Sequence, residues 1–393
     1  MRKHWDNCIA HFDEDVTAFI AEYFGKSDRR CLLVAAAGFD PRSRRIAEML
    51  ATAMLTRVTA LFIREERGRP NANLVADADA NEAELRALLP DCRVLRVNVF
   101  GDDDAPVGGM RIASTLSAVD IPAEVTDVVL DLTALSIGIG FPAARLLLEL
   151  CEQTAARSFH LMIASNPELD DRIVSEPSNR PMAVRGFSGT AGFGGTLEVA
   201  TVWLPQLTKG RGATLDGIGR SVGDCYKICP VVPFPARDPR RADALLAEHQ
   251  SRLVDEWFVD PRDIVYVSER NPLDCYRTLS TLKARYDLAV EGIYEPQIIL
   301  SPVGSKVMAA GALMAAIEHD LRVEYLETVR YEFHATTHPT APPPEMVVHL
   351  LLAGPAYTDM EAAVYECPAV TGEAGTTSPK DSKSADAEAT AAD

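Results

Sequence analysis

Short apolar runs alternate with longer helical stretches in the first part of this chain. The runs are nearly continuous in Val, Leu and Ile, which is typical of parallel strands that are buried on both faces of a sheet. The pattern predicts strands at 31–37, 57–64, 93–99, 127–132 and 159–164, and helices between them at 41–54, 80–89, 109–118 and 138–155. This alternation predicts a doubly wound, Rossmann-like α/β sheet.

A second part of the chain repeats the rhythm. It predicts strands at 228–234, 263–267, 297–301 and 322–328, with helices at 239–256, 271–287 and 305–319. A last strand at 347–352 is expected to close the edge of this second sheet. We therefore predict an α/β protein of two Rossmann-like lobes with mainly parallel sheets, which arose by internal duplication.

The predicted boundaries follow from breaks in this pattern. Residues 1–165 form the first lobe, including a helix at 5–24 whose apolar residues have helical spacing. Residues 166–226 form a glycine-rich connector or flap, and residues 227–367 form the second lobe. From about Gly372 the chain lacks large apolar side chains, so the tail at 368–393 is expected to be disordered.

Composition narrows the class of protein. No apolar run approaches the ~20 residues that span a bilayer, and the N-terminus lacks the apolar core of a signal peptide, so a cytoplasmic location and no membrane partner are expected. The net charge of −18 argues against a nucleic-acid partner. The eight cysteines are scattered, and the close pair Cys225 and Cys229 has no second pair, so no metal site is predicted.

An Asp-Pro-Arg sequence follows a predicted strand in each lobe. Asp40-Pro41-Arg42 comes after the strand at 31–37, and Asp238-Pro239-Arg240 comes after the strand at 228–234. Asp is a favoured helix cap and Pro a favoured first helical residue, so a structural role explains both. Because ligands of open α/β sheets bind at the carboxyl ends of strands, Arg42 and Arg240 are also candidate phosphate ligands, organised by Asp40 and Asp238.

A second pair of loops is more specific. Ser301-Pro-Val-Gly304-Ser305-Lys306 follows a buried strand and leads into a helix, whose free N–H groups would join a hydroxyl and an ammonium around one anion. The alternative is that Ser305 caps the helix and Lys306 faces solvent. The matching loop at 131–140 offers Thr133 and Ser136 but no cation, and could meet a sugar or base edge or form a tight turn.

The second loop resembles the ligand loop of CARF-type Rossmann-like domains, which sense cyclic oligonucleotides in prokaryotic antiviral systems. The matching residues are 303–306, Val-Gly-Ser-Lys, where the family commonly has Thr-Gly-Gly-Thr-Lys; Pro302 and Val303 depart from it. The resemblance covers about ten residues and the strand–helix order. It implies a sensor of a nucleotide, although no effector motif such as Arg-x-x-x-x-His follows.

An enzyme is an alternative. Glu269 and Asp274 lie next to the start of the helix at 271–287, and either could act as a general base on a nucleotide or phosphate ester in a hydrolase or transferase. Cys275 is a less suitable nucleophile because a cysteine inside a helix is usually buried. No dinucleotide fingerprint, P-loop, hydrolase elbow or zincin motif is present. A methyltransferase is a third hypothesis. It is less favoured because the loop at 35–40 has one glycine, where the cofactor loops of that class usually have several.

Our leading hypothesis is a sensor or regulator that binds a nucleotide or other phosphorylated small molecule between the lobes, in phage defence if the resemblance holds. The candidate ligand-binding residues are Asp40, Arg42, Thr133, Ser136, Asp238, Arg240, Gly304, Ser305 and Lys306. A non-catalytic scaffold subunit is the other alternative. A homodimer or a partner encoded by a neighbouring gene stays open, and the sequence names no cofactor.

Overall fold

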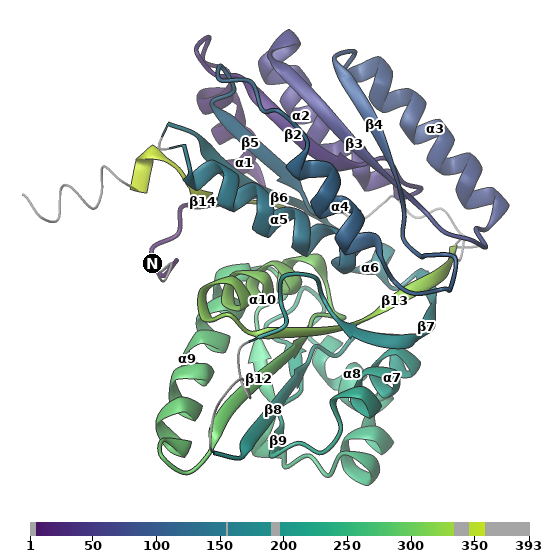
Figure 1. Cartoon of the computed structure of the whole chain (residues 1–393), viewed down its shortest axis with the longest axis vertical. Coiled ribbons are helices and arrows are strands. Elements are labelled where there is room, and N and C mark those ends of the chain that lie inside the picture. The colour runs from purple at the N-terminus through teal and green to yellow at the C-terminus, as the bar shows by residue number, and fades with distance from the viewer. Residues whose placement is uncertain (1–4, 155, 190–196, 334–345, 358–393) are drawn as a thin grey trace, which may run out of the picture. The chain divides into compact units, whose positions relative to one another are not determined.

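The computed structural model describes residues 5–154, 156–189, 197–333 and 346–357, and shows an α/β protein with two main sheets (Figure 1). The first sheet is seven-stranded in the described residues. Its spatial order is β1 (Ala10–Phe12), β14 (Met346–Ala353), β6 (Ser158–Ser165), β5 (Asp127–Asp131), β2 (Cys31–Ala36), β3 (Val58–Glu66) and β4 (Cys92–Asn98). Strands β2 to β6 are parallel, whereas β14 and β1 are antiparallel additions at one edge.

The second sheet is built in the same way. Its order is β7 (Ile173–Ala183), β13 (Arg322–Phe333), β12 (Glu295–Ser301), β8 (Val199–Pro205) and β9 (Lys227–Ile228). After β9 the same strand resumes as β10 (Val231–Pro233), because the bridge between Gln206 and Val231 keeps the register of the β8–β9 ladder. Strand β10 pairs in parallel with β11 (Val265–Val267).

The parallel strands of the two sheets have one order. Numbered along the chain, β2 to β6 lie in space as 3-2-1-4-5, and so do β8, β9/β10, β11, β12 and β13. This confirms the predicted Rossmann-like α/β class. It also assigns the strand at 228–234 to the second position of its sheet, whereas the strand at 31–37 is first. The shared order agrees with an internal duplication, which stays a prediction.

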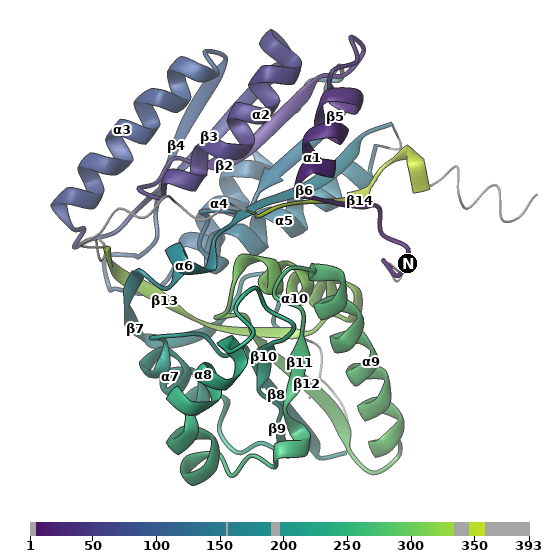
Figure 2. The same ribbon diagram turned by 180° about the vertical axis from the view of Figure 1, so that it is seen from behind.

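The two sheets exchange their antiparallel strands. Strand β7 follows β6 in the chain but pairs with β13 of the second sheet, and β14 follows β13 but pairs with β6 of the first (Figure 2). The strand predicted at 347–352 therefore belongs to the first sheet, where it is antiparallel, and not to the second sheet as we predicted. Strand β1 pairs with β14, so part of the helix predicted at 5–24 is extended. The segment 166–226, predicted as a connector, supplies β7 and β8.

Helices cover both faces of each sheet. On the first sheet, α1 (Glu14–Phe19), a π-helical turn (Ile20–Phe24), α2 (Arg45–Met54) and α3 (Ala72–Leu88) pack on one face, and α4 (Gly108–Ser117) and α5 (Ile137–Glu152) on the other. On the second, α9 (Pro272–Val290) and α10 (Lys306–His319) face α7 (Gly212–Val222) and α8 (Arg241–Glu248) across the strands. The short α6 (Pro167–Asp170) precedes β7.

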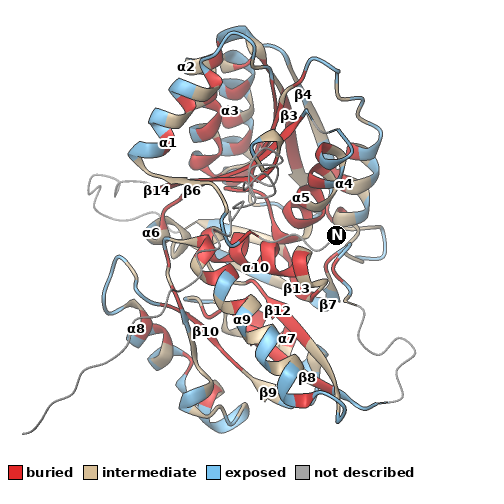
Figure 3. Cartoon of the chain, turned by 90° about the vertical axis from the view of Figure 1, so that its left-hand side faces the viewer, coloured by how far each residue is buried: buried red, intermediate tan, exposed pale blue. Residues whose placement is uncertain are grey.

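One apolar core joins the two sheets. It runs from the first sheet through α5 and α10 to β8 and β12 of the second. Helix α10 is buried almost all round, which explains its composition of Ala, Met and Gly (Figure 3). At Gly311 an added Cβ would lie 2.4 Å from the carbonyl oxygen of Pro272, so glycine lets α10 and α9 approach closely. No helix among the described residues could span a membrane.

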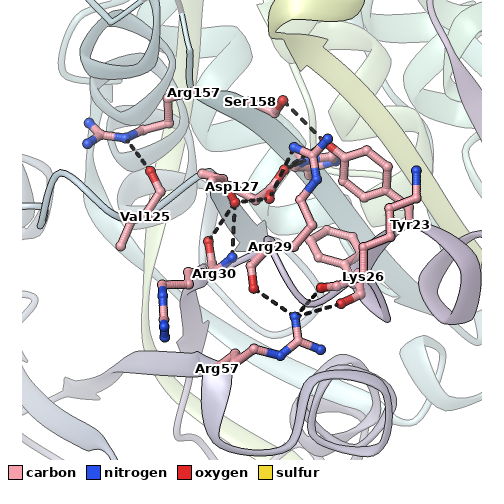
Figure 4. Close-up of polar contacts among 12 residues, drawn as sticks. Tyr23, Lys26, Arg29, Arg30, Arg57, Val125, Asp127, Arg157 and Ser158 are labelled. Carbon is pink, nitrogen blue, oxygen red and sulfur yellow. Dashed lines mark hydrogen bonds and ion pairs between the residues drawn. The ribbon is translucent and has the colours of Figure 1, made fainter.

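A polar row crosses the exchanged edge of the first sheet. Asp127 at the start of β5 accepts a hydrogen bond of 2.9 Å from the Tyr23 hydroxyl and lies 3.8 Å from Arg29 (Figure 4). On the next three strands His160, His349 and His11 continue the row, with contacts of 3.0 Å to Asp127 and 2.9 Å between successive rings. Burial, followed by the neighbouring imidazoles, lowers the pKa of His349 well below its usual value.

This row predicts a loss of stability in mild acid. An unfolded histidine takes up a proton near pH ~6.5, whereas His349 in the folded state resists it, so the free energy of unfolding should fall as pH drops below that value. Replacing His349→Gln should weaken this dependence. The measurement is urea unfolding of both proteins at pH 7.5 and 5.5. If the natural protein and the variant lose the same unfolding free energy between these pH values, His349 does not control the pH dependence.

Candidate functional site

A cavity of about 200 Å³ lies at the carboxyl ends of the parallel strands of both sheets. Its lining includes residues from the loops after β2, β5, β8 and β12. These four strands are the first and fourth of each sheet, and the order of each sheet reverses between them. Ligands of open α/β sheets bind at this switch point, so here two switch points meet at one cavity.

Most of the candidate ligand-binding residues line this cavity. Those that do are Asp40, Arg42, Thr133, Ser136, Gly304, Ser305 and Lys306. Asp238 and Arg240 do not, because they follow β10 and are exposed. We treated the two Asp-Pro-Arg loops as equivalent in the two lobes. In the structure, residues 37–40 follow the first parallel strand of their sheet, and the loop in the same position of the second sheet is the one after β8.

In the first Asp-Pro-Arg sequence the aspartate binds the arginine of the same motif. Asp40 caps the 3-10 helix Pro41–Arg44 by accepting from the backbone N–H of Arg42, and its carboxylate also binds the Arg42 guanidinium at 3.0 and 2.7 Å. Asp170 takes a further guanidinium N–H at 2.8 Å. Burial alone would lower the pKa of Arg42, but Asp170 and Asp40 raise it above its usual range. Two carboxylates thus already neutralise the arginine that we expected to bind phosphate.

A third Asp-Pro-Arg sequence explains this geometry. At Asp260-Pro261-Arg262 the aspartate caps a 3-10 helix and holds the arginine with the same atoms, and the Arg262 side chain is 88% exposed. The arrangement therefore forms without any pocket. It is a local feature of the sequence, and Arg42 differs from Arg262 in being buried and in binding Asp170 as a second carboxylate.

These two arginines make a matched pair of variants. Arg42→Ala would leave Asp40 and Asp170 without their counter-charge in a buried setting, and we expect a loss of about 3 kcal/mol of unfolding free energy. Arg262→Ala should cause no measurable change. Urea unfolding at pH 7.5 checks both. A small effect at Arg42 would mean that its carboxylates are well solvated.

The cations of the cavity lining that have no carboxylate partner among the described residues belong to the half of the second sheet. Lys306 begins α10 and donates a hydrogen bond to the carbonyl oxygen of Leu135, in the loop after β5. Lys209 and Arg211, in the loop after β8, also line the cavity. None of the three forms an ion pair with a carboxylate in the described part of the chain. Burial lowers the pKa of Lys306, although Glu65 and Asp170 raise it.

Several site residues were absent from our sequence analysis. Glu65 and Arg67 lie at and just after the end of β3, and Arg241 begins α8; all three line the cavity. Arg241 binds Asp171 at 3.1 Å and Glu269 at 2.8 Å, so it is paired like Arg42. The sequence carried a signal here, because Glu65-Glu66-Arg67 directly follows the apolar run that predicted a strand at 57–64.

The known proteins give no family for this chain. No protein-family model matches it, and no curated protein matches it. Among solved structures, it is similar to a chain assigned as a dehydrogenase of Burkholderia cenocepacia with bound NADP. The identity is 11%, the TM-score 0.20, and the match covers 69% of this chain and 91% of that one. A similarity this low does not support any functional assignment, so the site is described from its own residues alone.

The candidate catalytic residues do not line the cavity. Glu269 is buried in the pair with Arg241 and accepts from the backbone N–H of Arg237, and Asp274 accepts from the backbone N–H of Ser268 at the start of α9. Cys275 is fully buried, and burial raises the pKa of its thiol. Among the described residues, no group of three or more His, Cys, Asp and Glu is placed to hold a metal ion.

A buried acid supports the loop after β5. Asp131 accepts a hydrogen bond of 2.9 Å from the backbone N–H of Thr133, and its other oxygen has no partner among the described residues. Burial raises the pKa of Asp131 to about 7. The folded protein thus keeps a proton on this group over a pH range in which the unfolded chain, with a pKa of ~3.9, has lost it.

Asp131 should therefore lower stability as pH rises from about 4 to 7. Asp131→Asn keeps the acceptor for Thr133 but cannot ionise. Relative to the natural protein, we expect the variant to gain unfolding free energy between pH 5 and 8, on the order of a few kcal/mol. Urea unfolding at both values measures this difference. A constant offset at the two pH values would contradict the assignment.

Proposed function

We propose that the cavity binds a nucleotide or other phosphorylated small molecule, and that the chain is a sensor or regulator. The observation that carries the proposal is the meeting of both switch points at one cavity, which is lined by three cations without carboxylate partners in the described chain. Ser305 caps α10 by accepting from Met308 N–H at 3.3 Å, which orders the start of a helix whose dipole favours an anion.

A role in phage defence rests on the resemblance of residues 303–306 to the CARF-type loop and stays a proposal. The enzyme alternative has less support, since Glu269 and Asp274 do not line the cavity. The scaffold alternative predicts no ligand. Thermal unfolding with a panel of nucleotides separates these functions, because a ligand at 100 times its Kd adds about 2.7 kcal/mol of stability. Consumption of a stabilising nucleotide would favour an enzyme.

Lys306→Ala should weaken binding of the best nucleotide by about tenfold or more, since it removes a charge-assisted hydrogen bond. A bound phosphate would also favour the charged ammonium, so binding should take up protons and weaken as pH rises. Calorimetry at two pH values measures both effects. Lys26→Ala, at an exposed lysine outside the cavity, is the control. Equal losses in the two variants, or none, would remove Lys306 from the site.

A further inference from the structure

The residues that directly precede α5 and α10 have the same backbone conformation. Ser136 precedes α5 with φ −64° and ψ 157°, and Ser305 precedes α10 with φ −63° and ψ 156°. Both serines line the cavity, and each follows the fourth parallel strand of its sheet. The cavity thus lies between two helix starts of the same geometry, and a difference between them must come from the side chains around them.

At α10 the helix start faces cations. Lys306 is the first helical residue, and Lys209 and Arg211 come from the neighbouring loop after β8. Arg211 donates one hydrogen bond to the carbonyl oxygen of Ile173 at 3.3 Å. Nothing in the described residues places a carboxylate in an ion pair with any of the three. An anionic group of a ligand would supply the missing charge.

At α5 two carboxylates of the protein occupy the equivalent position. Glu65 Oε1 accepts a hydrogen bond of 2.8 Å from the backbone N–H of Ser136. Glu327 Oε2 lies 2.5 Å from the point that a Cβ on Gly138 would take, so glycine leaves room for this carboxylate beside the first turn. Negative charge is favourable at a helix N-terminus. The protein thus provides from β3 and β13 the anions that a ligand could bring.

Arg67 holds both carboxylates in place. Its Nη2 donates to Glu65 at 2.9 Å and lies 3.2 Å from Glu327, and its Nε donates to the carbonyl oxygen of Thr328 at 2.9 Å. The guanidinium lies 4.9 Å from the centre of the Tyr331 ring. All three charged side chains are at most 10% exposed. One cation among two carboxylates leaves this Glu65–Arg67–Glu327 cluster with a formal net negative charge.

A hydroxyl in the same half has no partner. Ser136 is 6% exposed and lines the cavity, and its Oγ forms no hydrogen bond within the described residues. In α10 the equivalent Ser305 hydroxyl caps its own helix, whereas the Ser136 hydroxyl does not. A buried hydroxyl without a partner costs free energy, and an uncharged polar group of a ligand would satisfy it.

We infer that the cavity takes a ligand with one anionic end, such as a nucleoside monophosphate or a sugar phosphate, and excludes a second phosphate. The anionic end lies at Ser305 and Lys306. The other end, bearing hydroxyl or amino groups, lies against Ser136 and Glu65, which line the cavity. Glu327 lies behind Glu65 and binds the same Arg67. This inference rests on the proposed function. It argues against a cyclic oligonucleotide, the ligand that the resemblance implies, because a ligand with a second phosphate would bring that charge to the carboxylates.

The test compares probes with one and two anionic ends by calorimetry at pH 7.5. AMP and GMP carry one phosphate end, and cyclic di-AMP and cyclic di-GMP carry two. We expect the natural protein to bind at least one monophosphate tenfold or more tightly than either cyclic dinucleotide. Glu327→Gln, which keeps the size of the side chain, should narrow that ratio by about tenfold. Glu332→Gln, at an exposed position of the same strand, should leave it unchanged.

The outcomes distinguish the two proposals. If a cyclic dinucleotide binds as tightly as the monophosphates, the cavity still binds nucleotides but the inference of a single anionic end is wrong. An unchanged ratio in Glu327→Gln, with the variant folded by circular dichroism, also overturns it. If none of the four probes nor inorganic phosphate binds, both the proposed function and the inference fail. Glu65→Gln repeats the test at the second carboxylate and should narrow the ratio in the same direction.

Discussion

The exchange of β7 and β14 between the sheets is the constraint on which the rest of the structure depends. Each strand leaves the lobe that precedes it in the chain and completes the antiparallel edge of the other. The chain therefore crosses between the two sheets twice, and each sheet is completed by a strand that follows the other sheet in the chain. Because the apolar core also continues between α5 and α10, the loops after β5 and β12 are held on opposite sides of one cavity.

Within this frame the two halves differ in how they balance charge. The arginines of the first half, Arg42 and Arg67, are each bound by two carboxylates. The cavity-lining cations that form no ion pair with a carboxylate in the described residues, Lys209, Arg211 and Lys306, come from the second half. In a chain with a net charge of −18, this concentrates positive potential on one wall of the cavity. Two sheets of the same strand order thus line one cavity with different charges.

The sequence predicted the parallel strands and most helices well, since buried parallel strands leave continuous apolar runs. It could not predict the strand exchange, because the apolar pattern of 347–352 shows that the strand is buried but not which sheet it joins. Strand β1 was missed for the same reason, as its partner lies more than 300 residues away. The break at Pro230 divided one predicted strand into β9 and β10 without changing its register.

The candidate site was predicted where one loop carries its own chemistry, as at 304–306, and was missed where the chemistry is shared between distant strands. The sequence could not predict the cluster of Arg67, Glu65 and Glu327, because it forms only where β3 and β13 lie close together in the fold. The Asp-Pro-Arg sequence led to the opposite error, because we assigned a ligand to a local motif that needs none. At Asp260 as at Asp40, the aspartate binds the arginine of its own motif. A charged side chain near a switch point is therefore informative only once its own partners are known. By that criterion Lys306 stays a candidate for an anion and Arg42 does not.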